Sequence, residues 1–165
     1  MSEENRALNA LVGAIQAEIE ANAFYTSLAQ RVTRASARER LLTLAHDEQG
    51  HRSHLEKRYR KLTGGEPDLS RPRTRPSLLQ VLHDHPLPER PGVMLIMETA
   101  MAAEKDASKF YAREASMAPD EEGRSMFHQL SQMEEGHRSW LEAEYQKMTG
   151  GLYWFDVTAP GIMEE

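Results

Sequence analysis

Cysteine is absent from the 165-residue chain, and this absence excludes several kinds of chemistry at once. Without a thiol there can be no disulfide, no thiolate metal ligand and no cysteine nucleophile. The length suits one domain with a sizeable core, or two small halves that share one core.

Long hydrophobic runs and an excess of basic residues are also lacking. The longest strongly apolar run, VMLIM at 93–97, is far too short to span a bilayer. The polar start MSEENR does not resemble a signal peptide, and a net charge of −6 argues against a broad nucleic-acid surface. We therefore expect a cytoplasmic protein that binds neither membrane nor nucleic acid.

An internal repeat is the main feature that is present. The stretch DEQGHRSHLEKRYRKLTGG at 47–65 returns as MEEGHRSWLEAEYQKMTGG at 133–151. A constant offset of 86 residues (103 minus 17) pairs 17–65 with 103–151 without a gap. Such self-similarity indicates a duplicated structural unit.

Each copy predicts two amphipathic helices, because its apolar residues recur at helical spacing. Ser36 with Glu39 predicts a capping box that opens the second helix. Pro119 and the acidic residues at 120–122 are typical of the start of the fourth helix. Both TGG sequences supply Gly where a helix would end.

The helices predict an all-α protein. We expect two helical hairpins at about 4–64 and 90–150, joined by a Pro-rich crossover at 65–92 that carries a short helix at 77–83. Two hairpins with one long connection form a four-helix bundle of the ferritin-like type.

The bundle domain is expected to span residues 1–151, followed by an aromatic tail at 152–165. An exposed aromatic run is a liability, so the tail should pack on the bundle or on a second subunit; a cargo or docking peptide is the alternative. The long crossover would also allow one hairpin to pair with that of a second chain. We expect a homodimer, either closed or domain-swapped.

Each predicted helix has an apolar stripe, the row of residues on its core-facing side. Glutamate and histidine interrupt these stripes at matching distances from the hairpin turns. Residues equidistant from a hairpin turn face each other, and the midpoints of the Glu18–Glu48 and Glu104–Glu134 pairs both fall inside the predicted turns. The repeat should therefore bring six polar side chains together in the middle of the bundle: Glu18, Glu48, His51, Glu104, Glu134 and His137.

This arrangement predicts a dinuclear metal site. Residues three apart are neighbours on a helix, so the Glu and His of each Glu-x-x-His can reach one ion together. One Glu from each of two helices plus Glu-x-x-His from the other two is the ligand set of di-iron and di-manganese bundles. Four carboxylates also neutralise two divalent ions. Mixed carboxylate and imidazole ligands favour iron or manganese over calcium or magnesium.

A structural role is the alternative interpretation of these buried residues, as salt bridges or satisfied polar groups. It is disfavoured because the stripes carry no Lys or Arg at this level. Four buried carboxylates would then lack compensation.

The remaining histidines have no counterpart in the repeat. We expect His46, His54 and His128 to be surface or packing residues. The HDH sequence at 83–85 could bind a metal, but it lies in the Pro-rich connection. The basic segment RPRTRP at 71–76 is interpreted as a solvated linker, with docking to an acidic partner as the alternative.

At these motifs the sequence resembles the rubrerythrin branch of the ferritin-like superfamily over about residues 5–151. EIEANAFY and EKDASKFY are similar to its first and third helix motifs, and EQGH and EEGH to its second and fourth. The resemblance implies that the six residues above ligate two iron ions. It also implies that Tyr25 and Tyr111 hydrogen-bond ligand carboxylates; core packing is their alternative role.

The sequence departs from that family in two ways. Many rubrerythrins carry a Cys-rich rubredoxin domain, which these residues cannot form, so the resemblance implies an external electron donor. Rubrerythrins also carry a further ligand Glu three residues after the third-helix Glu. Here that position is Ala107, which matches Ala21 in the repeat. The site should therefore be more symmetric than that of the family.

The resemblance implies a di-iron oxidoreductase that reduces hydrogen peroxide. The first alternative is a ferroxidase or iron-handling protein that reacts with dioxygen. The second is a metal-binding module without turnover. A di-iron hydroxylase of an organic or RNA substrate comes last, because the negative charge suits RNA poorly.

Overall fold

The computed structural model describes residues 2–70, 78–85, 87 and 90–150. Over this part of the chain the secondary structure is helical throughout, without a strand, which confirms the predicted all-α class. None of the described helices is long and apolar enough to cross a membrane. The helices are α1 (Glu3–Arg31), α2 (Ala35–Thr63), α3 (Leu78–Asp84), α4 (Arg90–Met117) and α5 (Glu121–Thr149).

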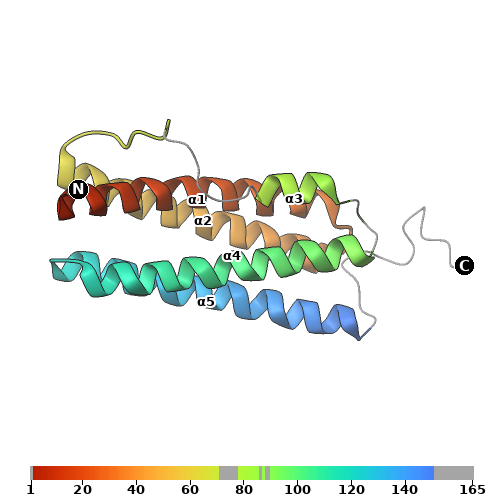
Figure 1. Cartoon of the computed structure of the whole chain (residues 1–165). Helices are drawn as coiled ribbons and strands as arrows, with labels where there is room; N and C mark the ends of the chain where they lie inside the picture. The colour runs from red at the N-terminus through yellow and green to blue at the C-terminus, as the bar shows by residue number, and fades with distance from the viewer. Residues whose placement is uncertain (1, 71–77, 86, 88–89, 151–165) are drawn as a thin grey trace, which may run out of the picture.

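The four long helices form an antiparallel bundle of two hairpins (Figure 1). Helix α1 packs against α2, and α4 packs against α5. The two hairpin turns lie at opposite ends of the bundle, so the chain must travel the length of the bundle between α2 and α4 (Figure 1). This geometry explains why the connection between the halves is long while the turns within them are short.

Two apolar clusters form the core, one on either side of the Glu and His level. One cluster contains Ile15, Leu55 and Phe127, and the other contains Phe24, Leu41 and Ile96. Each fully buried side chain of this size stabilises the fold by about 1.5–3 kcal/mol. The apolar stripes of the sequence therefore do face the core. Leu62 is an exception: its helical spacing from Leu55 and Tyr59 predicts a core position, but it is 45% exposed.

The helix ends agree only in part with the sequence signals. Helix α2 begins one residue before Ser36, and its N-cap, Arg34, makes no side-chain capping bond. The predicted Ser36–Glu39 capping box is therefore wrong, because Ser36 already lies within the first turn. Helix α2 does end as predicted, with Gly64 in the left-handed region at φ 74°.

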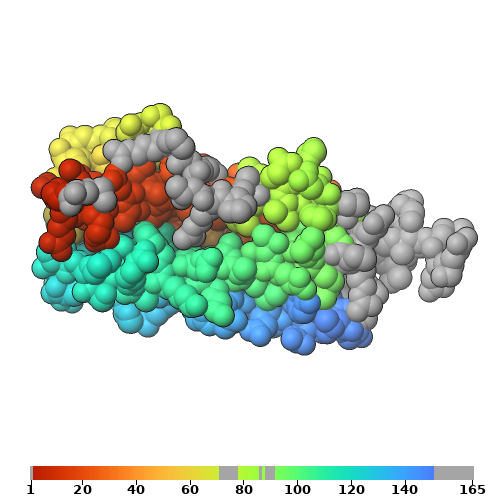
Figure 2. Space-filling view, in the orientation of Figure 1, coloured from red at the N-terminus to blue at the C-terminus, as the bar shows by residue number. Residues whose placement is uncertain are grey.

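The described part of the crossover is held on α1 (Figures 1 and 2). The buried Glu20 carboxylate accepts a hydrogen bond from the Leu78 backbone N–H at 2.6 Å, at the start of α3. Arg31 donates to the Leu82 carbonyl at 2.7 Å, near the end of α3. The predicted helix at 77–83 thus corresponds to α3. The RPRTRP segment and the tail at 152–165 lie outside the described residues.

A polar clamp joins the hairpins at the start of α5. The buried Arg58 of α2 donates to both carboxylate oxygens of Asp120, at 2.8 and 2.9 Å. Asp120 is also the N-cap of α5 and accepts from the Gly123 N–H at 2.8 Å. Gly123 fits here because it has no Cβ: an added methyl group would lie 2.7 Å from Asp120 Oδ1 and 2.9 Å from Arg58 Nη2.

The clamp gives a stability prediction. Gly-to-Ala changes inside exposed helices usually stabilise by about 0.5–1 kcal/mol. We expect Gly123→Ala to do the opposite and to lower the free energy of unfolding by about 1–2 kcal/mol, because the new methyl group displaces the capping carboxylate. Urea denaturation of the full chain measures the change.

Gly136→Ala is the matched control in the same helix. Nothing lies within 4 Å of a Cβ added at Gly136, so this variant should be stabilised by the usual amount. Equal stabilisation of both variants would show that Asp120 and Arg58 can move aside without cost.

Candidate metal centre

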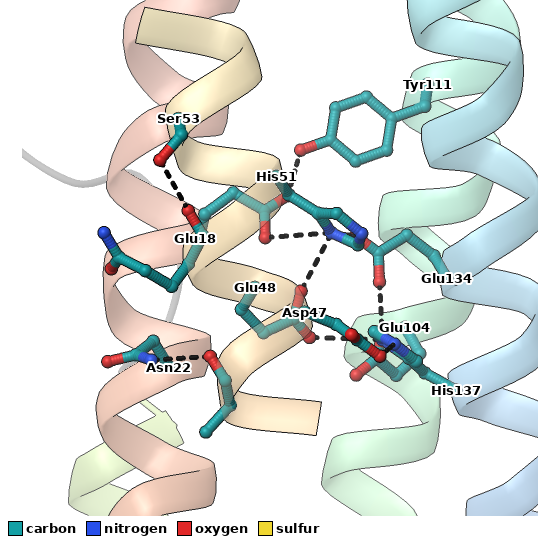
Figure 3. Close-up of polar contacts among 12 residues, drawn as sticks. Glu18, Asn22, Asp47, Glu48, His51, Ser53, Glu104, Tyr111, Glu134 and His137 are labelled. Atoms are coloured by element: carbon teal, nitrogen blue, oxygen red, sulfur yellow. Dashed lines mark hydrogen bonds and ion pairs between the residues drawn. The ribbon is translucent and has the colours of Figure 1, made fainter. Parts of the chain in front are cut away.

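All six Glu and His residues singled out by the repeat meet at one level of the bundle (Figure 3). Helices α1 and α4 each contribute one Glu, and α2 and α5 each contribute a Glu-x-x-His. Between 1% and 4% of each of these residues is exposed. The residues are Glu18, Glu48, His51, Glu104, Glu134 and His137.

Two of the carboxylates lie between the two imidazoles. The Nδ1 atom of His51 is 3.0 Å from Glu48 Oε2 and 3.0 Å from Glu134 Oε1. The Nδ1 atom of His137 is 3.3 Å from Glu48 Oε1 and 3.1 Å from Glu134 Oε2. Each of these carboxylates thus directs one oxygen to each histidine, which is the geometry of a bridging ligand.

The other two carboxylates each lie at one end of the cluster. Glu18 Oε2 is 3.5 Å from His51 Nδ1, and Glu104 Oε2 is 3.7 Å from His137 Nδ1. These contacts define two candidate metal positions. In both, the offered ligand atoms lie within 4.8 Å of one another, and Glu48 and Glu134 belong to both. The sequence left open which Glu would bridge, and the structure distinguishes them.

Two tyrosines hold the terminal carboxylates from the opposite hairpin. Tyr25 of α1 donates to Glu104 of α4, and Tyr111 of α4 donates to Glu18 of α1. Both rings are also buried in the apolar clusters. The two roles that the sequence left open, hydrogen bonding and packing, are thus combined in each residue.

The donor set fits a pair of metal ions. The two buried oxygens of Glu48 accept no well-aligned hydrogen bond from the described residues. Their contacts with His51 and His137, at 3.0 and 3.3 Å, are ion pairs only while the rings are protonated, so metal ions would supply the compensation that a buried carboxylate requires. Four carboxylates with two imidazoles suit two divalent ions in charge and in ligand type. Ala21 and Ala107 pack against the apolar clusters, so neither position adds a seventh ligand.

Asp47 is a residue of the site that the sequence reasoning missed. Its Oδ2 atom accepts a hydrogen bond from His137 Nε2–H at 3.2 Å. Because the contact crosses between hairpins, no spacing within one copy predicts it. The available signal was an acidic residue directly before Glu48 that has no acidic counterpart in the repeat, where Met133 stands.

Burial and close packing shift the pKa values of the cluster in opposite directions. Burial raises the pKa of Glu18 and Glu104 well above the ordinary carboxyl value, although hydrogen bonds to the histidines oppose it. Burial alone would lower the pKa of His51, but hydrogen bonds to the surrounding carboxylates raise it to about 12. Burial alone would raise the pKa of Glu134, as it does for Glu18 and Glu104, but hydrogen bonds to His137 and His51 lower it below the ordinary carboxyl value. Without metal, the cluster therefore retains protons.

The other sequence candidates lie away from the cluster. His46, His54 and His128 are exposed, as predicted. In the HDH sequence, His83 forms an ion pair with its neighbour Asp84 at 3.1 Å, and no group of three potential ligands forms there among the described residues.

Known proteins share both the sequence pattern and the fold. A family model described as Rubrerythrin matches residues 9–145. The solved structure of a hypothetical protein from Pyrococcus furiosus is 32% identical and superposes with a TM-score of 0.78, covering 88% of this chain and 93% of that one. No curated protein matches the chain.

The shared carboxylates predict how each substitution should affect metal content. Glu48→Ala or Glu134→Ala should impair both positions, because each residue belongs to both groups. His51→Ala or His137→Ala should impair mainly one. We expect wild type to bind two ions per chain, and anaerobic Fe(II) titration with metal analysis measures the loss.

Glu135→Ala is the control for Glu134, because Glu135 is exposed and pairs with Arg138 on the surface. It should retain both ions. Retention of two ions by Glu48→Ala and Glu134→Ala would rule out the bridging arrangement.

The raised pKa values give a pH prediction for the metal-free protein. A group whose pKa is higher in the folded state favours folding while it is protonated, and this contribution is lost as the pH rises through the folded value. For Glu18 and Glu104 the loss begins above about pH 4.5, and for His51 above about pH 6.5. With a chelator present, the melting temperature should therefore fall between about pH 5.5 and 8.5.

Glu104→Gln tests the cause, because the amide resembles the protonated carboxyl group. The metal-free variant should melt higher than wild type near about pH 8 and should show a weaker pH dependence. Saturating divalent metal should abolish the fall, because the deprotonated ligands bind it. A melting temperature of the metal-free wild type that rises over this range would contradict the assignment.

Proposed function

The chain belongs to the rubrerythrin family of ferritin-like di-iron proteins, and on that basis we propose that it reduces hydrogen peroxide as a di-iron oxidoreductase. The reaction consumes two electrons and two protons per peroxide and releases two waters. An external donor supplies the electrons. A pair of iron ions, when bound, provides the redox chemistry, and manganese is the other metal that these ligands suit.

The enclosed position of the ligands is the observation that carries this proposal. The six side chains are almost fully buried, and apolar clusters lie on both sides of them. An enclosed centre favours a substrate of two heavy atoms, such as peroxide or dioxygen. It also favours metal ions that stay in place, whereas iron storage requires oxidised iron to leave.

The protein's own residues keep the centre in one geometry. Glu48 and Glu134 would hold the two ions at a fixed separation, because each lies between the two histidines. The hydroxyls of Tyr25 and Tyr111 fix the orientation of the terminal carboxylates. Burial raises the pKa of both tyrosines further above 10, so they remain donors at neutral pH. The surrounding apolar side chains exclude water.

Stopped-flow mixing of the anaerobic Fe(II)-loaded protein tests the proposal. We expect peroxide to oxidise the centre much faster than dioxygen at equal concentration, and one peroxide to consume two Fe(II). His54→Ala, which changes an exposed histidine outside the centre, should behave like wild type. His137→Ala should lose the fast phase together with one metal position.

Two other outcomes would replace the proposal. Comparable oxidation by dioxygen, with iron uptake that continues beyond two ions per chain, would identify a ferroxidase. Stable binding without oxidation by either reagent would identify a metal-binding module.

A further inference from the structure

The two candidate metal positions have different surroundings, although the repeat makes their ligands equivalent. The 86-residue offset pairs His51 with His137, Glu48 with Glu134 and the Asp47 position with Met133. The histidine of each position lies against the opposite hairpin. His137 therefore meets Asp47, whereas the corresponding position of the repeat holds Met133, which cannot accept a comparable hydrogen bond.

The hydrogen bonds reflect this difference. The Nε2–H of His137 donates to Asp47 at 3.2 Å, and Asp47 is 29% exposed. The Nε2 atom of His51 is buried and has no hydrogen-bond partner among the described residues. Met133 is 42% exposed, and its thioether is at best a weak acceptor.

An acceptor at Nε2 matters because a neutral imidazole carries only one proton. When Asp47 accepts from Nε2–H, the proton is kept on that atom, and the lone pair of Nδ1 remains directed at the carboxylates that would share the ion. The same bond makes the imidazole a stronger donor. His51 lacks this support, and its Nε2–H would stay buried and unpaired when Nδ1 is ligated.

We propose that the two metal positions are not equivalent: the position formed with Glu104 and His137 fills first and holds its ion more tightly, with Asp47 as its positioning residue. This inference rests on the metal site of the proposed function but is independent of the reaction at that site. Loss of an outer partner of a ligating histidine typically costs about 10–100-fold in metal affinity.

The test uses Zn²⁺, which is diamagnetic, and the full chain labelled with ¹⁵N in its histidine rings. Imidazole ¹⁵N shifts report which histidine is ligated during the titration, and calorimetry gives the affinities. In wild type, His137 should shift during the first equivalent and His51 during the second. Asp47→Met should weaken the first ion by about 10–100-fold and remove the order.

Exchanging Asp47 and Met133 distinguishes a positioning role of Asp47 from general damage to the fold. Met133→Asp should supply His51 with an acceptor and tighten the second ion, and the double variant Asp47→Met/Met133→Asp should reverse the order of loading. Glu135→Met is the control, because it removes an exposed carboxylate that also adjoins a bridging Glu but contacts no ligating histidine. It should load in the wild-type order.

Several results would overturn the inference. Parallel shifts of both histidines in wild type would show equivalent positions and leave the metal site intact. An unchanged order in Asp47→Met, or no reversal in the double variant, would show that Asp47 does not position His137. Failure of wild type to bind Zn²⁺ would overturn the inference together with the metal site.

Discussion

The structure depends on one energetic constraint: four carboxylates and two imidazoles are buried at one level of a helical core, and burying them costs free energy. A protein of this size cannot keep four uncompensated charges inside its bundle. The histidines and the cross-hairpin tyrosines provide part of the compensation, and two divalent ions would provide the rest. The apolar clusters on either side keep the bundle folded around this layer.

Function and stability are therefore opposed in the same residues. The raised pKa values of Glu18 and Glu104 show that the metal-free fold favours their protonated forms, whereas metal binding requires them to be ionised. The apolar surroundings that shift these values also limit the access of water to the cluster. The site is thus organised for bound metal rather than for the stability of the empty bundle.

The internal repeat explains the symmetry of the candidate ligands but not the difference between their surroundings. Each hairpin supplies one terminal Glu, one bridging Glu and one His, and each supplies the tyrosine that orients the other hairpin's terminal carboxylate. The environment beyond the ligands has diverged, and the clearest difference is Asp47 against Met133. The repeat therefore supplies two similar sets of candidate ligands whose neighbouring side chains differ.

The sequence by itself determined the helices, the hairpin pairing and the identity of the six clustered residues, because helical periodicity and an exact repeat offset place those residues at one level. Local signals were less reliable: the predicted Ser36 capping box failed, because α2 begins before Ser36. Only the tertiary structure decided that Glu48 and Glu134 lie between the histidines, that each tyrosine reaches the opposite hairpin, and that Asp47 contacts His137. These contacts join residues from different hairpins. Their geometry depends on how the two hairpins pack against each other, and the spacing of residues within one helix does not encode that packing.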